Sequence, residues 1–429
     1  MMVKYLVLSA VLLFSQMSLG QSIFEGERVT LPWNVELFLK FEMIFNNYNE
    51  NIVANGIRSP RELRAIRLEY FELPVELVDI KINVSQLRTE VQDSLVFEKN
   101  GQQWVRWFFN PEDEMYRDKI LAHFRESSGR ELELQSGRFA GFLTASRSTV
   151  VKDLKTGALF SMKASTNRTG GPWQGSDGSK RLRGATAEYG VETSNYIEHN
   201  LPTEGTNLRF APEFASLKTK SLADYGVSFR DYEMFYNSDV IYIPFFSVFN
   251  DRAKEVFGLV MDNLVPKNLV EFWRNKVSVY AGRAFGDLVG HLGLIPHSAH
   301  NQDLLLIVRN GQLTEEVLLR DLNDLIPVSE IVSKKVYGDR ILSYSRSVGN
   351  SFEFIFQPFM GSQLPHEIVY NESVFNSGGK AFLDRVSQIL RLNLTYERDW
   401  ASGIFHKFRL PAFLHISNES NVKTCRSLF

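Results

Sequence analysis

The fold is organised around residues 293–324, GLIPHSAHNQDLLLIVRNGQLTEEVLLRDLND. A polar turn leads into the apolar run 304–308, and a second apolar run follows the dipeptide Asn310-Gly311. Asn-Gly between two apolar runs is a strong signal for a tight β-hairpin, because both residues tolerate the left-handed backbone of that turn. The segment therefore predicts two antiparallel strands joined at Asn310-Gly311.

Polar side chains should gather at the open end of this hairpin. They are His300, Gln302 and Asp303 before the first strand, and Arg320 and Asp321 after the second. A carboxylate can hold Mg²⁺, amide and imidazole groups can contact phosphate oxygens, and a cation can stabilise negative charge. An ordinary hairpin with solvated ends would have the same composition, so the chemistry depends on the rest of the chain.

Outward from the hairpin, the preceding segment is helical in pattern. Apolar residues recur at three- and four-residue spacing through 272–292, which predicts an amphipathic helix that ends at Gly293. His291 falls within this pattern and is expected to pack or cap rather than to bind a ligand.

Further upstream, short apolar runs predict an antiparallel meander over 137–143, 148–154 and 159–163. The meander ends in the loop KASTNRTGG at 163–171, which holds a lysine, three hydroxyl side chains, Arg168 and two glycines. Such a loop can surround a polyphosphate, because hydroxyl and backbone N–H groups donate hydrogen bonds and arginine contacts two oxygens at once. A solvated loop is the alternative. The Gly/Ser-rich stretch 172–183 is expected to form a flap.

Several further segments have clear patterns. We expect a helix at 185–199, strand ends that carry charge at 208–213 and 226–231, and a central strand pair around Pro244 within 236–249. Strands are also expected at 78–84, 104–109, 332–345 and 352–359, and an amphipathic helix at 380–392.

The first twenty residues have the pattern of a secretory signal. Lys4 precedes an apolar stretch at 5–19, and small residues at Ser18 and Gly20 suit cleavage before Gln21. The apolar stretch is short for a membrane span, and no later stretch is long enough, so we expect no transmembrane segment. The mature protein is expected to be exported, either to a periplasm or outside the cell.

Composition limits the remaining possibilities. With Cys425 as its single cysteine, the chain cannot form an internal disulfide, so its stability must come from a conventional core. A hydrophobic content of 44% over 429 residues is enough to build that core. The formal charge of −2 gives no general attraction to nucleic acid, so none is expected as a partner.

These patterns predict an α+β protein in five parts. We assign 1–20 to the signal peptide and 21–135 to an N-terminal α+β lobe, followed by a β-rich nucleotide-loop lobe at 136–255. Residues 256–330 hold the helix and the hairpin, and 331–429 form a C-terminal α+β region.

The ordered motifs resemble the NRPS-independent siderophore synthetase family of the IucA/IucC type. They are Lys163-Ala-Ser-Thr-Asn-Arg-Thr169, Phe210-Ala-Pro-Glu213, Gly226-Val-Ser-Phe-Arg230-Asp231, His300-Asn-Gln-Asp303 and Arg320-Asp321. The resemblance covers about 163–324, and it rests on the shared order of these motifs, since each one is short.

This resemblance implies a hand-like, kinase-related fold with an antiparallel sheet and helical lobes. It implies binding of ATP and Mg²⁺, adenylation of a small, citrate-like carboxylate, and transfer of the acyl group to an amine or hydroxyl substrate. The residue roles that it implies fall into three groups. Arg168, Arg230 and His300 would be catalytic, Lys163, Ser165, Thr166, Thr169, Gln302, Asp303 and Arg320 would bind the nucleotide, and Asp321 would hold the metal.

The chain also departs from the family pattern. Asn301 stands where the family has glycine, Asp303 where it has asparagine and Asp231 where it has glutamate. Together with the signal peptide, these changes leave two alternatives to an ATP-dependent ligase. One is a non-catalytic exported binding protein on the same scaffold, and the other is an exported kinase-like phosphotransferase.

Overall fold

The computed structural model describes most of the chain between residues 22 and 415. The described ranges are 22–24, 27–43, 65–110, 114–144, 147–165, 182–220, 225–248, 253–260, 268–296, 302–327, 372–391, 395–398 and 412–415. The expected signal peptide and the expected strands at 332–345 and 352–359 lie outside them.

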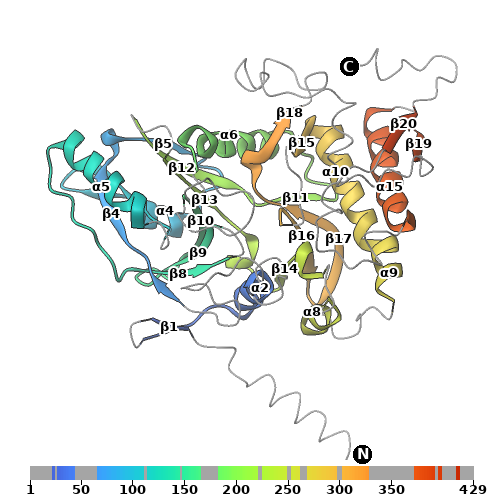
Figure 1. Ribbon diagram of the computed structural model, residues 1–429, viewed down its shortest axis with the longest axis horizontal. Helices are drawn as coiled ribbons and strands as arrows, with labels where there is room; N and C mark the ends of the chain where they lie inside the picture. The colour runs from blue at the N-terminus through green and yellow to red at the C-terminus, as the bar shows by residue number, and fades with distance from the viewer. Residues whose placement is uncertain are drawn as a thin grey trace, which may run out of the picture.

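A seven-stranded sheet forms the larger half of the protein (Figure 1). Its strands, in spatial order, are β3 (Ile66–Arg67), β8 (Phe139–Leu143), β9 (Ser148–Asp153), β10 (Leu159–Ala164), β13 (Gly226–Arg230), β12 (Glu213–Thr219) and β5 (Val78–Ile82). All neighbouring pairs are antiparallel. The meander predicted from the sequence is therefore confirmed as β8, β9 and β10.

One face of this sheet packs against an aromatic core. The core is covered by the antiparallel sheet of β4 (Tyr70–Pro74), β7 (Gln102–Phe108) and β6 (Val96–Lys99), with α4 (Thr89–Leu95) and α5 (Glu114–Ser128) beside it. Rings meet edge-on at its centre, as between Phe108 and Phe139, 4.9 Å between centroids. Edge-to-face packing adds to the burial of large apolar surfaces and fixes this half of the molecule.

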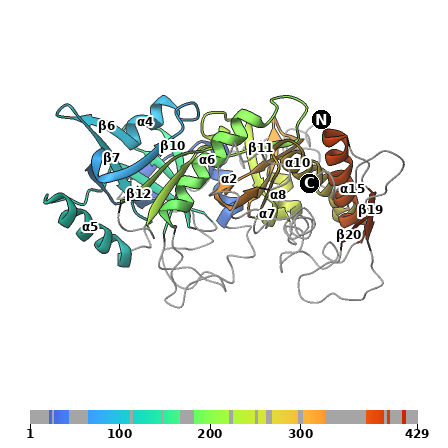
Figure 2. The ribbon, with the colours of Figure 1, turned by 90° about the horizontal axis from the view of Figure 1, so that it is seen from above.

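The opposite face of the sheet carries helix α6 (Gly184–Asn200), which lies along β12 and β13 (Figure 2). Close approach is possible because α6 presents Gly184 and Gly190 to the sheet. A Cβ added at Gly184 would lie 2.5 Å from Cβ of Lys218. The sequence predicted this helix at 185–199, and the structure confirms it.

A second, four-stranded sheet forms the other half. Its order is β11 (Leu208–Phe210), β17 (Gln312–Leu319), β16 (Leu304–Arg309) and β14 (Val240–Pro244), with β11 parallel to β17. The predicted hairpin is confirmed: Asn310 and Gly311 have φ values of 49° and 70°, so both adopt the left-handed backbone of a tight turn. Helix α2 (Trp33–Met43) packs against β14.

The expected strand pair around Pro244 is wrong. The strand β14 ends at Pro244, and the next residues form the short helix α7 (Phe245–Val248). Proline cannot donate a backbone hydrogen bond, which favours the end of a strand there. The apolar pattern continued past Pro244 because α7 is also buried.

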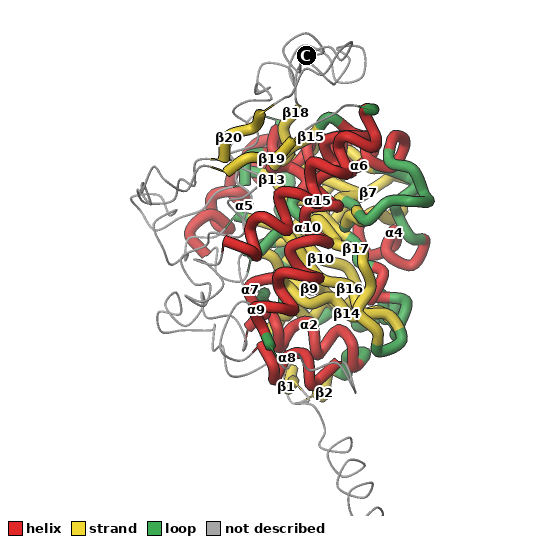
Figure 3. Tube along the Cα trace, turned by 90° about the vertical axis from the view of Figure 1, so that its right-hand side faces the viewer, coloured by secondary structure: helices red, strands yellow, loops and turns green. Residues whose placement is uncertain are grey.

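Two long helices cover the outer side of the second sheet (Figure 3). The predicted helix before Gly293 is confirmed as α9 (Leu269–Phe272), a π-helical turn (Trp273–Val277) and α10 (Ser278–Leu292), which ends at Gly293 with φ 63°. Helix α15 (Glu372–Leu390) packs along α10, and a Cβ at Gly282 would lie 2.2 Å from the carbonyl oxygen of Gly378. The sequence predicted only the second half of α15, from residue 380.

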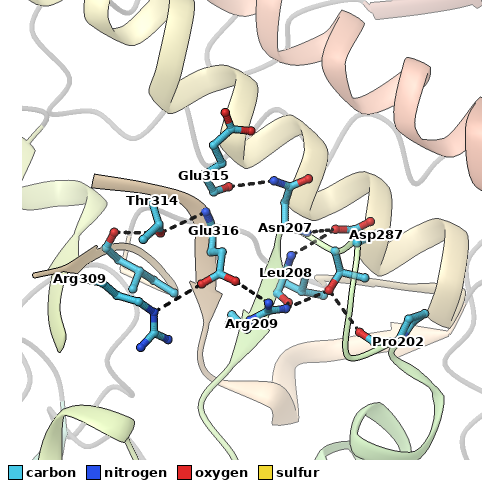
Figure 4. A network of polar contacts seen from close by, with 12 residues as sticks. Pro202, Asn207, Leu208, Arg209, Asp287, Arg309, Thr314, Glu315 and Glu316 are labelled. Carbon is cyan, nitrogen blue, oxygen red and sulfur yellow. Dashed lines mark hydrogen bonds and ion pairs between the residues drawn. The ribbon is translucent and has the colours of Figure 1, made fainter. Parts of the chain in front are cut away.

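Asp287 of α10 joins these helices to the second sheet (Figure 4). Its carboxylate accepts hydrogen bonds from the backbone N–H groups of Asn207 and Leu208, at 2.5 and 3.2 Å, and from Nε of Arg385 at 2.6 Å. The same network continues along the sheet through Glu316, which contacts both Arg209 and Arg309. Asp287 therefore fixes the position of β11 relative to α10, and Glu316 pairs with the charge of Arg209 on that strand.

The remaining described elements are small. They are the η-type turns Val75–Leu77, Glu233–Phe235 and Leu322–Asp324, helix α8 (Ala253–Val260), and the two-stranded pairs β1 (Ser22–Phe24) with β2 (Glu27–Val29), β15 (Leu294–Pro296) with β18 (Leu325–Pro327), and β19 (Thr395–Arg398) with β20 (Ala412–His415). Among the described helices, none has the length and apolar character that crossing a bilayer requires.

Candidate functional site

Three charged side chains from distant parts of the sequence meet where the two sheets approach each other. Lys163 lies near the end of β10, Arg230 is the last residue of β13, and Asp321 follows the end of β17. Ser161 pairs with Arg230 in the antiparallel ladder. Since side chains two residues apart on a strand share a face, Lys163 and Arg230 project from the same side of the sheet.

Asp321 is the meeting point of the two cations. Its Oδ1 atom accepts a hydrogen bond from Nη2 of Arg230 at 2.8 Å and a second from Nζ of Lys163. The backbone of Asp321 has a φ of 70°, and aspartate is among the few non-glycine residues that tolerate this left-handed conformation. The Asp321 side chain is 25% exposed, whereas Lys163 and Arg230 are 8% and 5% exposed. Solvent therefore reaches the group through the carboxylate.

Glu213, the first residue of β12, contacts the cluster formed by Lys163, Arg230 and Asp321. Its Oε1 atom accepts hydrogen bonds from Nη2 of Arg230 at 2.8 Å and from the backbone N–H of Leu322 at 3.1 Å. Its side chain is fully buried against α6, where a Cβ on Gly190 would lie 2.0 Å from Oε2. Glu213 thus ties the first sheet, helix α6 and the segment after the hairpin to one another.

The charges shift each other's ionisation. Burial on its own would raise the pKa of Asp321, but Lys163 and Arg230 hold it well below the ordinary aspartate value. Burial lowers the pKa of Lys163, and although Asp321 opposes this, the cations Arg147 and Arg230 add to it. The Asp321 carboxylate is therefore ionised at neutral pH and attracts neighbouring cations.

The residues on the hairpin side have different partners. Arg320 points toward α2, where its Nη1 atom lies 2.7 Å from Oε1 of the buried Glu42. Its Nε atom donates to the backbone carbonyl of Gln302 at 2.7 Å, and its backbone N–H donates to the carbonyl of Asp303 at 2.9 Å. Arg320 thus fixes the base of the hairpin. Asp303 has a raised pKa because it is buried and lies near Asp321 and Asp324.

Ser165 lies at the start of the predicted phosphate loop. Its Oγ atom accepts a hydrogen bond from the backbone N–H of Leu182 at 2.9 Å, so the residue after β10 contacts the residues that lead into α6. Thr166, Arg168, Thr169 and His300 lie outside the described residues. Of the predicted site residues, the structure brings together Lys163, Arg230 and Asp321, with Asp303 close enough to affect their electrostatics.

Two members of the site were not assigned a role from the sequence. Glu213 was noted only as part of a motif, and Arg147 of the β8–β9 turn was not singled out. Arg147 is buried, and its charge acts on Asp321 and Glu213. The signal for Glu213 is its place as a charged residue at the start of the apolar strand β12. Asp231, in contrast, turns away from the site and pairs with Arg88 at 2.7 and 2.9 Å.

The described residues offer limited ligands for a magnesium ion. Within these ranges, no group of three or more His, Cys, Asp or Glu side chains could hold a metal. Lys163 and Arg230 both donate to Oδ1 of Asp321, so neither of these two hydrogen bonds uses Oδ2. Magnesium is often bound by one or two carboxylates together with substrate phosphates and water. The site fits that arrangement and not a complete cage of protein ligands.

Comparison with known proteins shows the fold. The aerobactin synthetase IucC from a hypervirulent pathotype of Klebsiella pneumoniae is 13% identical with a TM-score of 0.52 and matches 77% of this chain and 63% of its own. The petrobactin biosynthesis protein AsbB from Bacillus anthracis is 13% identical with a TM-score of 0.53, over 82% and 68%. ATP-bound aerobactin synthetase IucA from Klebsiella pneumoniae is 12% identical with a TM-score of 0.53, over 79% and 64%.

The relation is structural, since no protein-family model and no curated protein matches the sequence. The chain spans about two thirds of the length of these synthetases. The α+β siderophore-synthetase-like fold predicted from the motifs is confirmed.

Proposed function

We propose that this protein binds ATP and joins a small carboxylate to an amine or a hydroxyl through an acyl-adenylate. The observation that carries the proposal is the convergence of Lys163, Arg230 and Asp321 in a fold shared with siderophore synthetases, one of which is described as ATP-bound. The three residues belong to three separate sequence motifs, and the proposed ligase requires these motifs to share one site.

The cations would act on the phosphates. An oxygen of the substrate carboxylate attacks the α-phosphorus of ATP, the new C–O–P linkage forms, and the bond to pyrophosphate breaks. Negative charge then grows on the departing pyrophosphate, and Lys163 and Arg230 would stabilise it, since fixed charges in a buried site act more strongly than in water. The amine or hydroxyl then attacks the acyl carbon, and AMP leaves with the bonding electrons and one proton is released.

Asp321 would have two roles in this sequence. Before ATP arrives it neutralises Lys163 and Arg230, and phosphate oxygens would replace its Oδ1 atom when the nucleotide binds. A bound Mg²⁺ would supply charge neutralisation between phosphate oxygens, with Asp321 as its carboxylate ligand. Glu213 would keep Arg230 aligned during this exchange, because its contact to Arg230 is separate from that of Asp321.

A second candidate is a binding protein without catalysis. It is favoured by the same ion pairs, because Asp321 already satisfies both cations without a ligand. Asp303 in place of the family asparagine also adds a carboxyl group near the expected phosphates. Such a protein would hold a carboxylate or a siderophore on the same scaffold and would not turn it over.

Calorimetry on the full chain separates these functions. We expect Mg-ATP to bind, and we expect Arg168→Ala to lose that binding. Arg309→Ala is the matched control, since Arg309 pairs with Glu233 at 2.6 Å, in the β16–β17 hairpin but away from the cluster. No heat of binding with millimolar Mg-ATP would rule out the ligase.

A turnover assay completes the test. Pyrophosphate release that depends on citrate and an amine supports the ligase, whereas ATP binding without release supports the binding protein. Transfer of labelled γ-phosphate to an acceptor would instead identify the kinase-like phosphotransferase.

A further inference from the structure

Arg147 occupies an unusual place for an arginine. It lies in the turn that joins β8 to β9, and turns normally expose such side chains to water. Arg147 is only 8% exposed. The turn is held from both sides, because Nδ2 of Asn110 donates to the carbonyl of Arg147 at 3.3 Å and the backbone N–H of Thr144 donates to the carbonyl of Ser148 at 3.1 Å.

The sheet register places this turn next to the candidate site. Ser148, the residue after Arg147, pairs with Lys163 of β10. Arg147 therefore lies beside the end of β10 at which Lys163 leads into the predicted phosphate loop. Its charge acts on Asp321 and Glu213, the two carboxylates that hold Arg230.

This arrangement gathers like charges. The positive charges of Arg147 and Arg230 both disfavour the protonated form of Lys163. Three cations therefore share one buried region. A guanidinium is suited to contact two oxygens of one phosphate, and neighbouring cations strengthen the attraction for such a group.

We propose that Arg147 binds a phosphate group of the nucleotide, together with Lys163 and Arg230. The inference rests on the proposed function and adds a contact residue that the motif comparison did not provide. A phosphate rather than a substrate carboxylate is favoured, because Arg147 lies beside Lys163 in the sheet, and Lys163 shares Asp321 with Arg230, the other cation proposed to contact the phosphates of ATP.

The same hairpin supplies a matched control. Arg138 lies next to β8 at the opposite end of the β8–β9 hairpin, and its Nη2 atom donates to Oδ2 of the buried Asp153 at 2.7 Å. Arg138→Gln removes a largely buried arginine with a clear internal partner. It is expected to weaken the fold and to leave nucleotide affinity unchanged.

The test measures affinity by calorimetry for Mg-ATP, AMP, pyrophosphate and citrate. Arg147→Gln should weaken Mg-ATP and pyrophosphate binding about ten- to a hundredfold, the usual effect of losing a hydrogen bond between charged groups. AMP and citrate affinities should change far less. Arg147→Lys keeps the positive charge but cannot contact two phosphate oxygens with a planar guanidinium, so it should lose an intermediate amount of Mg-ATP affinity. This variant provides the test if Arg147→Gln does not fold.

The outcomes distinguish this inference from the proposed function. Equal Mg-ATP affinity of wild type and Arg147 variants would overturn the inference while the ligase proposal stands. A loss confined to citrate would also overturn it, since the arginine would then serve the carboxylate. If wild type binds no Mg-ATP, the proposed function fails. Pyrophosphate binding that depends on Arg147 would still support a phosphate site, and its absence would end both proposals.

Discussion

Two aspartates with arginine partners, Asp287 and Asp321, show how one kind of ion pair serves two purposes. Asp287 is fully buried, and its two oxygens accept hydrogen bonds from Arg385 and from two backbone N–H groups. Asp321 is a quarter exposed, and both of its cations contact one oxygen. The Asp287 carboxylate has no exposed surface and joins α10 to β11 and α15. The Asp321 carboxylate is partly exposed to solvent, as the proposed exchange with a nucleotide requires.

The largest expected effect on stability is at Asp287. Asp287→Ala should lower the free energy of unfolding by about 3–5 kcal/mol, because it leaves Arg385 without its carboxylate and two backbone donors unsatisfied. Urea denaturation measures this change. Arg283→Ala on the same helix is the control, since its pair with Glu315 is exposed and should contribute less than about 1 kcal/mol. Equal effects of the two variants would contradict the assignment of Asp287 as a structural centre.

A smaller effect on stability is expected at Asp321. Asp321→Asn should cost about 1–3 kcal/mol at neutral pH, less than Asp287→Ala because water can partly replace the lost charge. Since the pKa of Asp321 is depressed in the folded protein, its contribution is present above the unfolded value and is lost as pH falls through the folded value. The difference between wild type and variant should therefore shrink in acid.

Melting temperatures between pH 3 and pH 7 check this expectation. The same variant should also remove the magnesium dependence of ATP binding, which Asp287→Ala should leave intact in the molecules that remain folded. A gap in stability that widens toward acid would show that the carboxylate does not stabilise the fold through these ion pairs.

The smallest effect concerns Asp303, and its sign is opposite. Burial and two neighbouring carboxylates raise its pKa, so its neutral form is favoured in the folded state. The resulting stability is complete below the unfolded pKa of about 4 and is lost as pH rises through the folded pKa. Asp303→Asn stays neutral, so it should be as stable as wild type in acid and slightly more stable above neutral pH. A variant that is less stable than wild type at pH 8 would contradict this.

Much of the fold followed from local patterns in the sequence. The hairpin at Asn310-Gly311, the helix that ends at Gly293 and the meander β8–β10 each depend on nearby residues, and each was confirmed. The strand expected beyond Pro244 was wrong because a buried helix has the same run of apolar residues as a buried strand.

The partners of charged residues were harder to foresee. Arg320 and Asp321 are neighbours in sequence, yet Arg320 contacts Glu42 and Asp321 contacts Lys163 and Arg230. Consecutive side chains along an extended strand point to opposite faces, and Asp321 also has a left-handed backbone that nothing in the local pattern required. Arg147 was missed for a similar reason, since a turn residue is expected in solvent unless distant segments cover it.

The distance along the chain between Lys163 and Asp321 has a consequence for how the protein assembles. They are 158 residues apart, and Asp321 arrives only with the end of the β16–β17 hairpin. During synthesis, the first sheet is therefore complete while its buried cations still lack this carboxylate. Contacts over such separations form late because a long loop must close first. The cluster of Lys163, Arg230 and Asp321 is thus expected to form late in the assembly of the two-sheet body, and a chain interrupted before residue 304 would hold both buried cations without the carboxylate that they share.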